Sequence, residues 1–138
     1  MAVDRVFLDA NILFSAAYKG ASRLRLLWRI SNAELITSEY AVEEARRNLL
    51  RARPESMTEF ESLLDGLTVI GSPSVLPGLL PEELDGKDAP ILAAAVRSEA
   101  THFLTGDKRH FGRFVGQTIR GVYITTAAHY LRERDTLE

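Results

Sequence analysis

Short apolar runs alternate along the chain with segments whose apolar residues recur at helical spacing. The runs are β-branched or aromatic and are bounded by polar or turn-forming residues, which is typical of buried strands. The pattern predicts strands at residues 3–8, 34–37, 67–70, 102–105 and 121–125. It predicts a helical turn at 12–17 and helices at 21–32, 39–51, 54–66, 89–100 and 126–134.

The order of these elements predicts the fold class. Strands that alternate with helices form right-handed crossovers and a parallel sheet that is covered on both faces. Residues 1–138 contain no internal repeat, low-complexity tract or long linker. We therefore expect a single domain with a three-layer α/β/α sandwich and a mostly parallel central sheet.

Residues that favour helix starts occur at several of the predicted helix boundaries. Ser22 is placed to cap the helix at 21–32, and Thr37 or Ser38 the helix at 39–51. Pro54 stands at a helix start, where its missing N–H costs nothing. Trp28 shares the helical spacing of its apolar neighbours, which favours a place in the core or at a dimer surface over a role in stacking on a base.

Composition narrows the functional classes. The chain has 138 residues, 46% of them hydrophobic, and a net charge of −2, so bulk charge does not indicate a protein that coats nucleic acid. Cysteine is absent, which excludes disulfides, thiolate metal sites and cysteine nucleophiles. No apolar run is long enough for a membrane helix, and the first residues do not resemble a secretory signal. The expected location is the cytoplasm, with no membrane association.

Acidic residues stand where a parallel sheet places its functional sites. Such sheets bind ligands beyond the carboxyl ends of their strands. If the first and fourth strands lie side by side, their acids gather at one edge. The candidates are Asp9 and Asn11 after the first strand, Glu43 and Glu44 after the second, Asp85 and Asp88 before the helix at 89–100, and Asp107 after the strand at 102–105.

Crowded carboxylates point to a hard divalent cation. Each negative neighbour raises the cost of ionising a carboxylate, and a doubly charged ion removes that cost. An all-oxygen ligand set without cysteine suits Mg²⁺ or Mn²⁺ better than Zn²⁺. A site of this kind polarises a phosphodiester, activates water and stabilises the leaving oxygen. The corresponding reaction class is phosphodiester hydrolysis.

Each acid also has a structural explanation. Asp88 is equally well placed to cap a helix, to serve the site, or to do both, and Asp85 is better explained as a cap or loop residue. Glu43 is most simply a solvated helix residue, whereas Glu44 is ambiguous. Asp9 is the hardest to explain structurally, because a bare charge directly after an apolar strand is costly without a partner.

Four segments together resemble the motifs of PIN-domain ribonucleases, a family that includes the toxins of VapC-type toxin–antitoxin pairs. They occur in the family's order and span nearly the whole chain. The segments are VFLDANIL at residues 6–13, TSEYAVEEA at 37–45, KDAPILAAA at 87–95 and LTGDKRHF at 104–111. The resemblance implies a PIN-like fold and hydrolysis of RNA with Mg²⁺ or Mn²⁺.

The resemblance also implies roles for individual residues. Glu44 is preferred over Glu43 because the glutamate of the family usually precedes a small apolar residue, here Ala45. Adjacent helix residues differ by about 100° in direction, so the two glutamates cannot face the site equally. The implied catalytic and metal-binding residues are Asp9, Glu44 (Glu43 as the alternative), Asp88 and Asp107, with Asn11 and Thr105 orienting ligands or water.

The sequence also offers candidate RNA-binding residues and candidate partners. A basic cluster follows Asp107 in sequence and is the better candidate for contacting an RNA backbone; it comprises Lys108, Arg109, His110 and Arg113. A second candidate cluster comprises Arg23, Arg25 and Arg29. The resemblance implies a homodimer and, for a toxin, a small antitoxin partner. The helices before Asn32 and at 54–64 are candidate interface elements.

Two other functions fit parts of the sequence. One is a non-catalytic RNA- or protein-binding module of the same fold, which a metal-dependent cleavage assay would distinguish. The other is a phosphoacceptor receiver domain, which needs an acidic pair after the first strand. Ala10 follows Asp9 in this chain and counts against the receiver domain.

Overall fold

The computed structural model describes residues 3–18, 22–72, 80, 81, 84, 86, 88–106 and 111–137. Its strands are β1 (Asp4–Leu8), β2 (Ala33–Ser38), β3 (Thr68–Ile70), β4 (His102–Thr105), β5 (Thr118–Ile119) and β6 (Val122–Thr126). Its α-helices are α1 (Ala10–Tyr18), α2 (Glu39–Ala52), α3 (Met57–Leu64), α4 (Ala89–Arg97) and α5 (Ala127–Leu137). Three 3₁₀ segments are η1 (Arg23–Arg29), η2 (Pro54–Ser56) and η3 (Gly112–Phe114).

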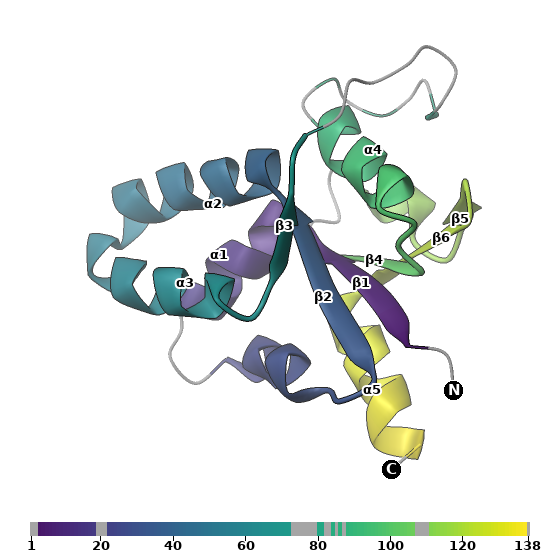
Figure 1. Cartoon of the computed structure of the whole chain (residues 1–138), viewed down its shortest axis with the longest axis horizontal. Coiled ribbons are helices and arrows are strands. Elements are labelled where there is room, and N and C mark those ends of the chain that lie inside the picture. Colours follow the sequence, from purple (N-terminus) through teal and green to yellow (C-terminus); the bar gives the residue numbers. More distant parts are fainter. Residues whose placement is uncertain are drawn as a thin grey trace.

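One six-stranded sheet forms the centre of the molecule, with the strand order β3-β2-β1-β4-β6-β5. All neighbouring pairs are parallel except β5 and β6, which are antiparallel. Helices α1, α2 and α3 lie on one side of the sheet and α4 lies on the other (Figure 1). The predicted α/β/α sandwich with a mostly parallel sheet is therefore confirmed.

The strand order creates a switch point beside β1. The chain moves from β1 outward to β2 and β3, and then returns to form β4 on the opposite side of β1. Helices that connect strands in opposite directions leave a crevice at the carboxyl ends of the two central strands. Here that crevice follows Leu8 of β1 and Thr105 of β4; Leu8 pairs with Leu104, the residue before Thr105.

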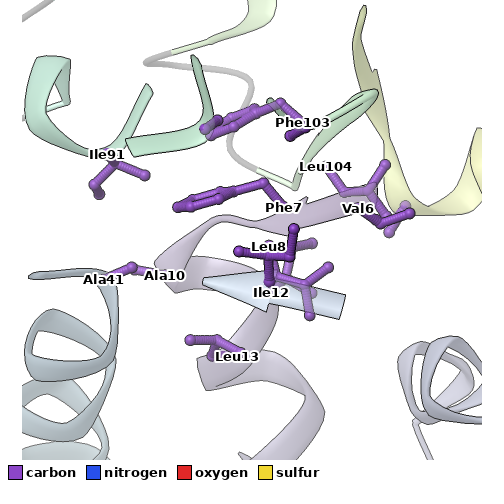
Figure 2. Packing of buried hydrophobic residues seen from close by; sticks show 14 of the residues in the cluster. Val6, Phe7, Leu8, Ala10, Ile12, Leu13, Ala41, Ile91, Phe103 and Leu104 are labelled. Atoms are coloured by element: carbon purple, nitrogen blue, oxygen red, sulfur yellow. The ribbon is translucent and has the colours of Figure 1, made fainter. Parts of the chain in front are cut away.

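The core holds these two strands together. Phe7 of β1 stacks on Phe103 of β4 with ring centroids 5.7 Å apart, on the same side as Ile91 of α4 (Figure 2). Leu8 points to the other side of β1, toward Ile12 of α1. All five side chains are at most 2% exposed. Burial of such side chains stabilises by about 1.5–3 kcal/mol each, so the sheet edge is a rigid platform.

The segment at 21–32 differs from the predicted α-helix. It forms the 3₁₀ helix η1, which ends at Ile30 in an extended conformation. The predicted cap is confirmed, because the Ser22 hydroxyl accepts the Leu24 N–H at 3.1 Å. Trp28 packs against the core and donates its indole N–H to the Leu63 carbonyl at 2.9 Å. These tertiary contacts fix the segment in a tighter helix than its spacing predicts.

The remaining differences are local. The predicted helix at 54–66 is split into η2 and α3, and strand β5 was not predicted because two residues carry no periodic signal. Within the described ranges, none of the helices combines the length and apolarity that crossing a bilayer requires.

Candidate active site

Buried polar side chains gather at one edge of the sheet. Of the buried polar or charged residues in the described part of the chain, only Ser56 lies away from the carboxyl ends of the parallel strands. Such groups are costly to bury unless they are hydrogen-bonded or serve a purpose beyond stability. The residues at this edge are Asp9, Thr37, Ser38, Asp88, Thr105 and Thr125.

Asp9 occupies the switch point itself. It follows β1, begins the turn into α1, and is 4% exposed. Its Oδ1 accepts the Ala10 N–H at 2.7 Å, and its Oδ2 accepts the Thr105 hydroxyl at 2.9 Å. Its own N–H donates to the Leu104 carbonyl at 3.1 Å, which continues the pairing of β1 with β4. The carboxylate is thus held in one orientation by groups from both central strands.

The environment of Asp9 disfavours its ionised form. Burial raises the pKa of Asp9 from 3.8 to about 7, against the lowering effect of the hydrogen bonds from Thr105 and Ala10. The negative charges of Glu44 and Asp88 raise the pKa of Asp9 further. Asp9, Glu44 and Asp88 come from three separate elements, and the structure brings them within electrostatic reach of one another.

The two adjacent glutamates of α2 are in different surroundings. Helix α2 is capped by Ser38, whose hydroxyl accepts the Ala41 N–H at 3.2 Å, as predicted. Glu43 is exposed and pairs with Arg46 on the outside of the helix, at 2.6 Å between Oε1 and Nη1. Glu44 is half-buried and is the glutamate whose charge acts on Asp9.

Asp88 stands at the N-cap position of α4 and is 7% exposed. Its side chain makes no capping hydrogen bond to the described amides of the helix, whereas its carbonyl accepts the N–H groups of Ile91 and Leu92. The capping explanation offered by the sequence is therefore wrong for the side chain of Asp88. Asp85 and Asp107 lie outside the described residues.

Asn11 connects the first turn of α1 to the end of β4. Its Oδ1 accepts the Gly106 N–H at 3.0 Å, and its Nδ2 donates to the Thr105 hydroxyl at 3.4 Å. The Thr105 hydroxyl in turn donates to Asp9. Asn11 and Thr105 thus lie beside Asp9 in one hydrogen-bonded chain, and their role in orienting ligands or water stays a prediction.

The donor chemistry of this edge fits a hard divalent cation. Within the described ranges, no three acidic or histidine side chains come close enough to surround one ion. Mg²⁺ needs only one or two protein carboxylates, because waters and substrate phosphate complete its octahedral shell. Each carboxylate oxygen of Asp9 accepts one described hydrogen bond and keeps a further lone pair. A cation there would also reverse the penalty on ionised Asp9.

A groove lies next to the acid site, and Asp9, Glu44 and Asp88 are not among its lining residues. It encloses about 490 Å³ between α1, η1 and the start of α5, and meets the acid site at Asn11, Thr105 and Gly106. Its lining also includes the exposed Arg132 of α5. Sequence reasoning missed Arg132, since nothing in the helical pattern at 126–134 indicates that this residue lines a groove with Asn11 and Thr105.

The predicted basic clusters have different outcomes. Arg113 is exposed in η3, whereas Lys108, Arg109 and His110 lie outside the described residues. The second cluster is divided by the fold. Arg25 pairs with Glu59 at 2.9 Å and donates to the Ala16 carbonyl at 2.8 Å, so it ties η1 to α3 and α1. The place of Arg25 on an RNA surface stays a prediction, and these contacts give its side chain a structural role as well.

Comparisons with known proteins agree with this geometry. The family model described as PIN domain matches residues 5–109. A search of the curated proteins finds no match. Among solved structures, the chain is similar to one in the crystal structure of VapBC2 from Rickettsia felis bound to a DNA fragment from its promoter. That match has a TM-score of 0.65 and 16% sequence identity, and covers 88% of this chain and 98% of the other, so it shows a shared fold.

PIN domains are generally nucleases and generally use divalent metal ions, which supports a hydrolase as the kind of enzyme. The matched segment begins at the second residue of β1 and includes the sheet edge that holds Asp9, Glu44 and Asp88. With more than half of its length matched by the family model, and with the expected fold around that edge, the chain belongs to the PIN domain family.

Proposed function

We propose that the protein is an endoribonuclease that uses Mg²⁺ or Mn²⁺ to hydrolyse RNA phosphodiester bonds. The observation that carries the proposal is the buried Asp9 carboxylate at the switch point, whose pKa is raised to about 7 by burial and by the charges of Glu44 and Asp88. Buried like charges destabilise a fold unless they serve a ligand. The ligand class that relieves them is a divalent cation.

In this proposal Asp9, Glu44, Asp88 and Asp107 hold the cation and form the catalytic acids. The bound cation would polarise the scissile phosphodiester and lower the pKa of the attacking water. The chain itself supplies orientation: the Thr105 hydroxyl and the Ala10 N–H fix both oxygens of Asp9. Asn11 steadies Thr105 and the turn at Gly106, so the acid site keeps its shape when substrate enters.

Glu44 is favoured over Glu43 as the ligand from α2. Glu43 neutralises Arg46 on the exposed face of the helix, and Arg46 also pairs with Glu61 of α3 at 2.9 Å. Using Glu43 as a ligand would break that network. Glu44 already contributes to the field at Asp9, so its carboxylate needs no such rearrangement.

The substrate and partners are part of the same proposal. RNA would be drawn to the acids by Lys108, Arg109, His110 and Arg113. The structural neighbour belongs to a VapBC2 complex, which supports a role for this chain as the toxin of a pair with a cognate antitoxin protein. Homodimer formation and a cytoplasmic location remain predictions from the sequence.

The direct test compares the wild type with Asp9→Asn, Glu44→Gln, Asp88→Asn and Asp107→Asn. Cleavage of single-stranded RNA is followed with Mg²⁺, with Mn²⁺ and with EDTA. We expect metal-dependent internal cleavage by the wild type and a loss of about 100-fold or more in each variant, because each carboxylate supports the reacting centre electrostatically. Glu43→Gln is the matched control, since it removes the same charge one residue away.

Two results would overturn the proposal. One is full activity of Asp9→Asn, and the other is equal cleavage in EDTA and Mg²⁺. A wild type that binds RNA tightly but cleaves none with either metal would favour the non-catalytic binding module. The receiver domain is no longer an alternative, because the chain belongs to the PIN domain family.

A further inference from the structure

The groove beside the acids is more than an extension of the candidate metal site. Glu44 and Asp88 approach Asp9 from α2 and α4, whereas the groove lies between α1, η1 and α5. Only Asn11, Thr105 and Gly106 belong to both regions. An RNA strand whose scissile phosphate is bound at the acids continues away from them. This groove provides a path for the continuing strand.

We infer that this groove seats the nucleotides next to the scissile phosphate of single-stranded RNA, with Arg132 contacting a backbone phosphate. The inference rests on the proposed nuclease function and names the path of its substrate. The groove's volume of about 490 Å³ lies within the range of small-ligand sites, which is roughly 300–1,000 Å³. Arg132 is therefore a substrate-positioning residue supplied by the last helix.

The lining of the groove fits a nucleotide. The half-buried Leu24 supplies apolar surface on which the face of a base can pack, and Ser15 and Asn11 supply hydroxyl and amide groups for sugar or base edges. Arg132 adds an exposed cation whose planar guanidinium matches the oxygens of a phosphate. Proteins that bind single strands combine cations along the backbone with side chains on which bases stack, and the groove supplies the cation.

The groove continues into a second hollow. This hollow encloses about 410 Å³, shares Ser15 and Leu24 with the first, and is also lined by Phe14 and Tyr18. The two aromatic rings lie one helical turn apart on α1, with centroids 5.4 Å apart and planes inclined by 32°. Arg53 lies over the Tyr18 ring at 5.1 Å from its centroid, which holds the ring in place.

Phe14 and Tyr18 give the RNA strand a second binding surface. Both are half-buried, so each keeps surface for a base to contact. Base stacking on an aromatic side chain contributes about 1–3 kcal/mol and tolerates any base sequence. Because the two hollows share Ser15 and Leu24, they form a track from Asn11 and Thr105, beside Asp9, to Phe14 and Tyr18.

The test measures binding without cleavage. A fluorescent single-stranded RNA of mixed sequence is titrated in EDTA with the wild type, Arg132→Gln and Arg97→Gln. Arg97 is the matched control, because it is exposed at the opposite end of α4 from the acids. We expect Arg132→Gln to weaken binding about three- to tenfold and to reduce the slope of log K against log salt by about 0.7, with no such change in Arg97→Gln.

Steric filling provides an independent variant. Ala128 is exposed at the start of α5 and lines the groove, so Ala128→Trp places an indole in the proposed path. We expect weaker RNA binding with an unchanged salt slope, because no charge is removed. Leu50→Trp is the control, since it adds an indole at an exposed position of α2 outside the groove. In cleavage assays Arg132→Gln should raise KM and leave kcat unchanged.

The outcomes separate this inference from the proposed function. If Arg132→Gln and Ala128→Trp bind RNA as the wild type does, the groove serves a protein partner or nothing and the inference is wrong. If both weaken binding in EDTA while the wild type cleaves no RNA with Mg²⁺ or Mn²⁺, the groove assignment holds and the nuclease proposal fails. Thermal unfolding of each variant confirms that the compared proteins are folded.

Discussion

The hydroxyl of Thr105 donates a hydrogen bond of 2.9 Å to Asp9, a residue 96 positions earlier in the chain. The two residues end the neighbouring parallel strands β4 and β1 at the point where the direction of the connections reverses. The bond is buried, and it opposes the desolvation that raises the pKa of Asp9. Thr105 therefore partly controls how readily this acid becomes available as a ligand.

Thr105→Val tests that control. Valine preserves the shape of threonine but cannot donate to Asp9, so we expect the pKa of Asp9 to rise above about 7. Losing the donor should also cost about 1–2 kcal/mol of stability at a pH where Asp9 is ionised. Titration of the Asp9 carboxyl by carbon NMR measures the first effect. Thr105→Ser, which keeps the hydroxyl, is the control; an unshifted Asp9 in Thr105→Val contradicts the prediction.

Asp9→Asn should stabilise the metal-free protein at neutral and alkaline pH. The folded state binds the Asp9 proton more tightly than the unfolded state, because the pKa is about 7 in the fold and 3.8 for the unperturbed group. Between these values the free energy of unfolding of the wild type falls, relative to Asp9→Asn, as the pH rises. The pH-dependent part of this difference should vanish below about pH 4 and reach at most about 4 kcal/mol above pH 7.

Chemical denaturation of both proteins across this pH range in EDTA measures the difference. Using Asp9→Asn as the reference cancels the titration of groups that the two chains share. A gap between the proteins that is independent of pH would show that burial does not disfavour ionised Asp9.

Divalent ions should offset the free-energy cost of ionising the buried Asp9. We expect Mn²⁺ or Mg²⁺ to raise the Tm of the wild type as the concentration increases, because a ligand that binds only the folded state stabilises it. Asp9→Asn should show almost no shift, and Asp88→Asn a smaller one than the wild type. Calcium-free thermal scans with added EDTA give the baseline. Equal shifts in all three proteins would place the ion elsewhere on the molecule.

Gly66→Ala should destabilise the fold without affecting the chemistry. A Cβ at this position would approach Cδ1 of Trp28 to 2.8 Å, and that rigid ring is held by its hydrogen bond to the Leu63 carbonyl. We expect a loss of about 1–3 kcal/mol in the free energy of unfolding. Cleavage per folded molecule should be unchanged. A stability equal to that of the wild type would mean that Trp28 moves freely, contrary to its packing.

The sequence predicted the parts of the fold that depend on local pattern. The apolar run that ends at Leu8 predicted β1, and the serine before α2 predicted a cap that the structure confirms at Ser38. The two-residue strand β5 was missed because it is too short to show a period. The segment around Trp28 was predicted as an α-helix, but its contacts with α3 hold it as a 3₁₀ helix.

In the candidate site, too, some features could be predicted from the local sequence and others depend on tertiary contacts. Asp9 could be singled out because a charge directly after an apolar strand needs an explanation in any fold. The choice between Glu43 and Glu44 could not be made from spacing, and it remains a prediction that the surroundings of Arg46 and Asp9 support. The ion pair of Arg25 could not be predicted, because its partner Glu59 is 34 residues away in sequence.

By itself, the sequence determined the alternation of strands and helices and the placement of acids just beyond the strands, since both follow from short-range preferences for burial and for turns. Only the tertiary structure decided that β1 and β4 are neighbours, that Asp9 is shielded from water between them, and that Arg132 lines a groove with Asn11 and Thr105. The physical reason is that a pKa, an ion pair or a groove depends on distances through space, and the order of strands in the sheet sets those distances.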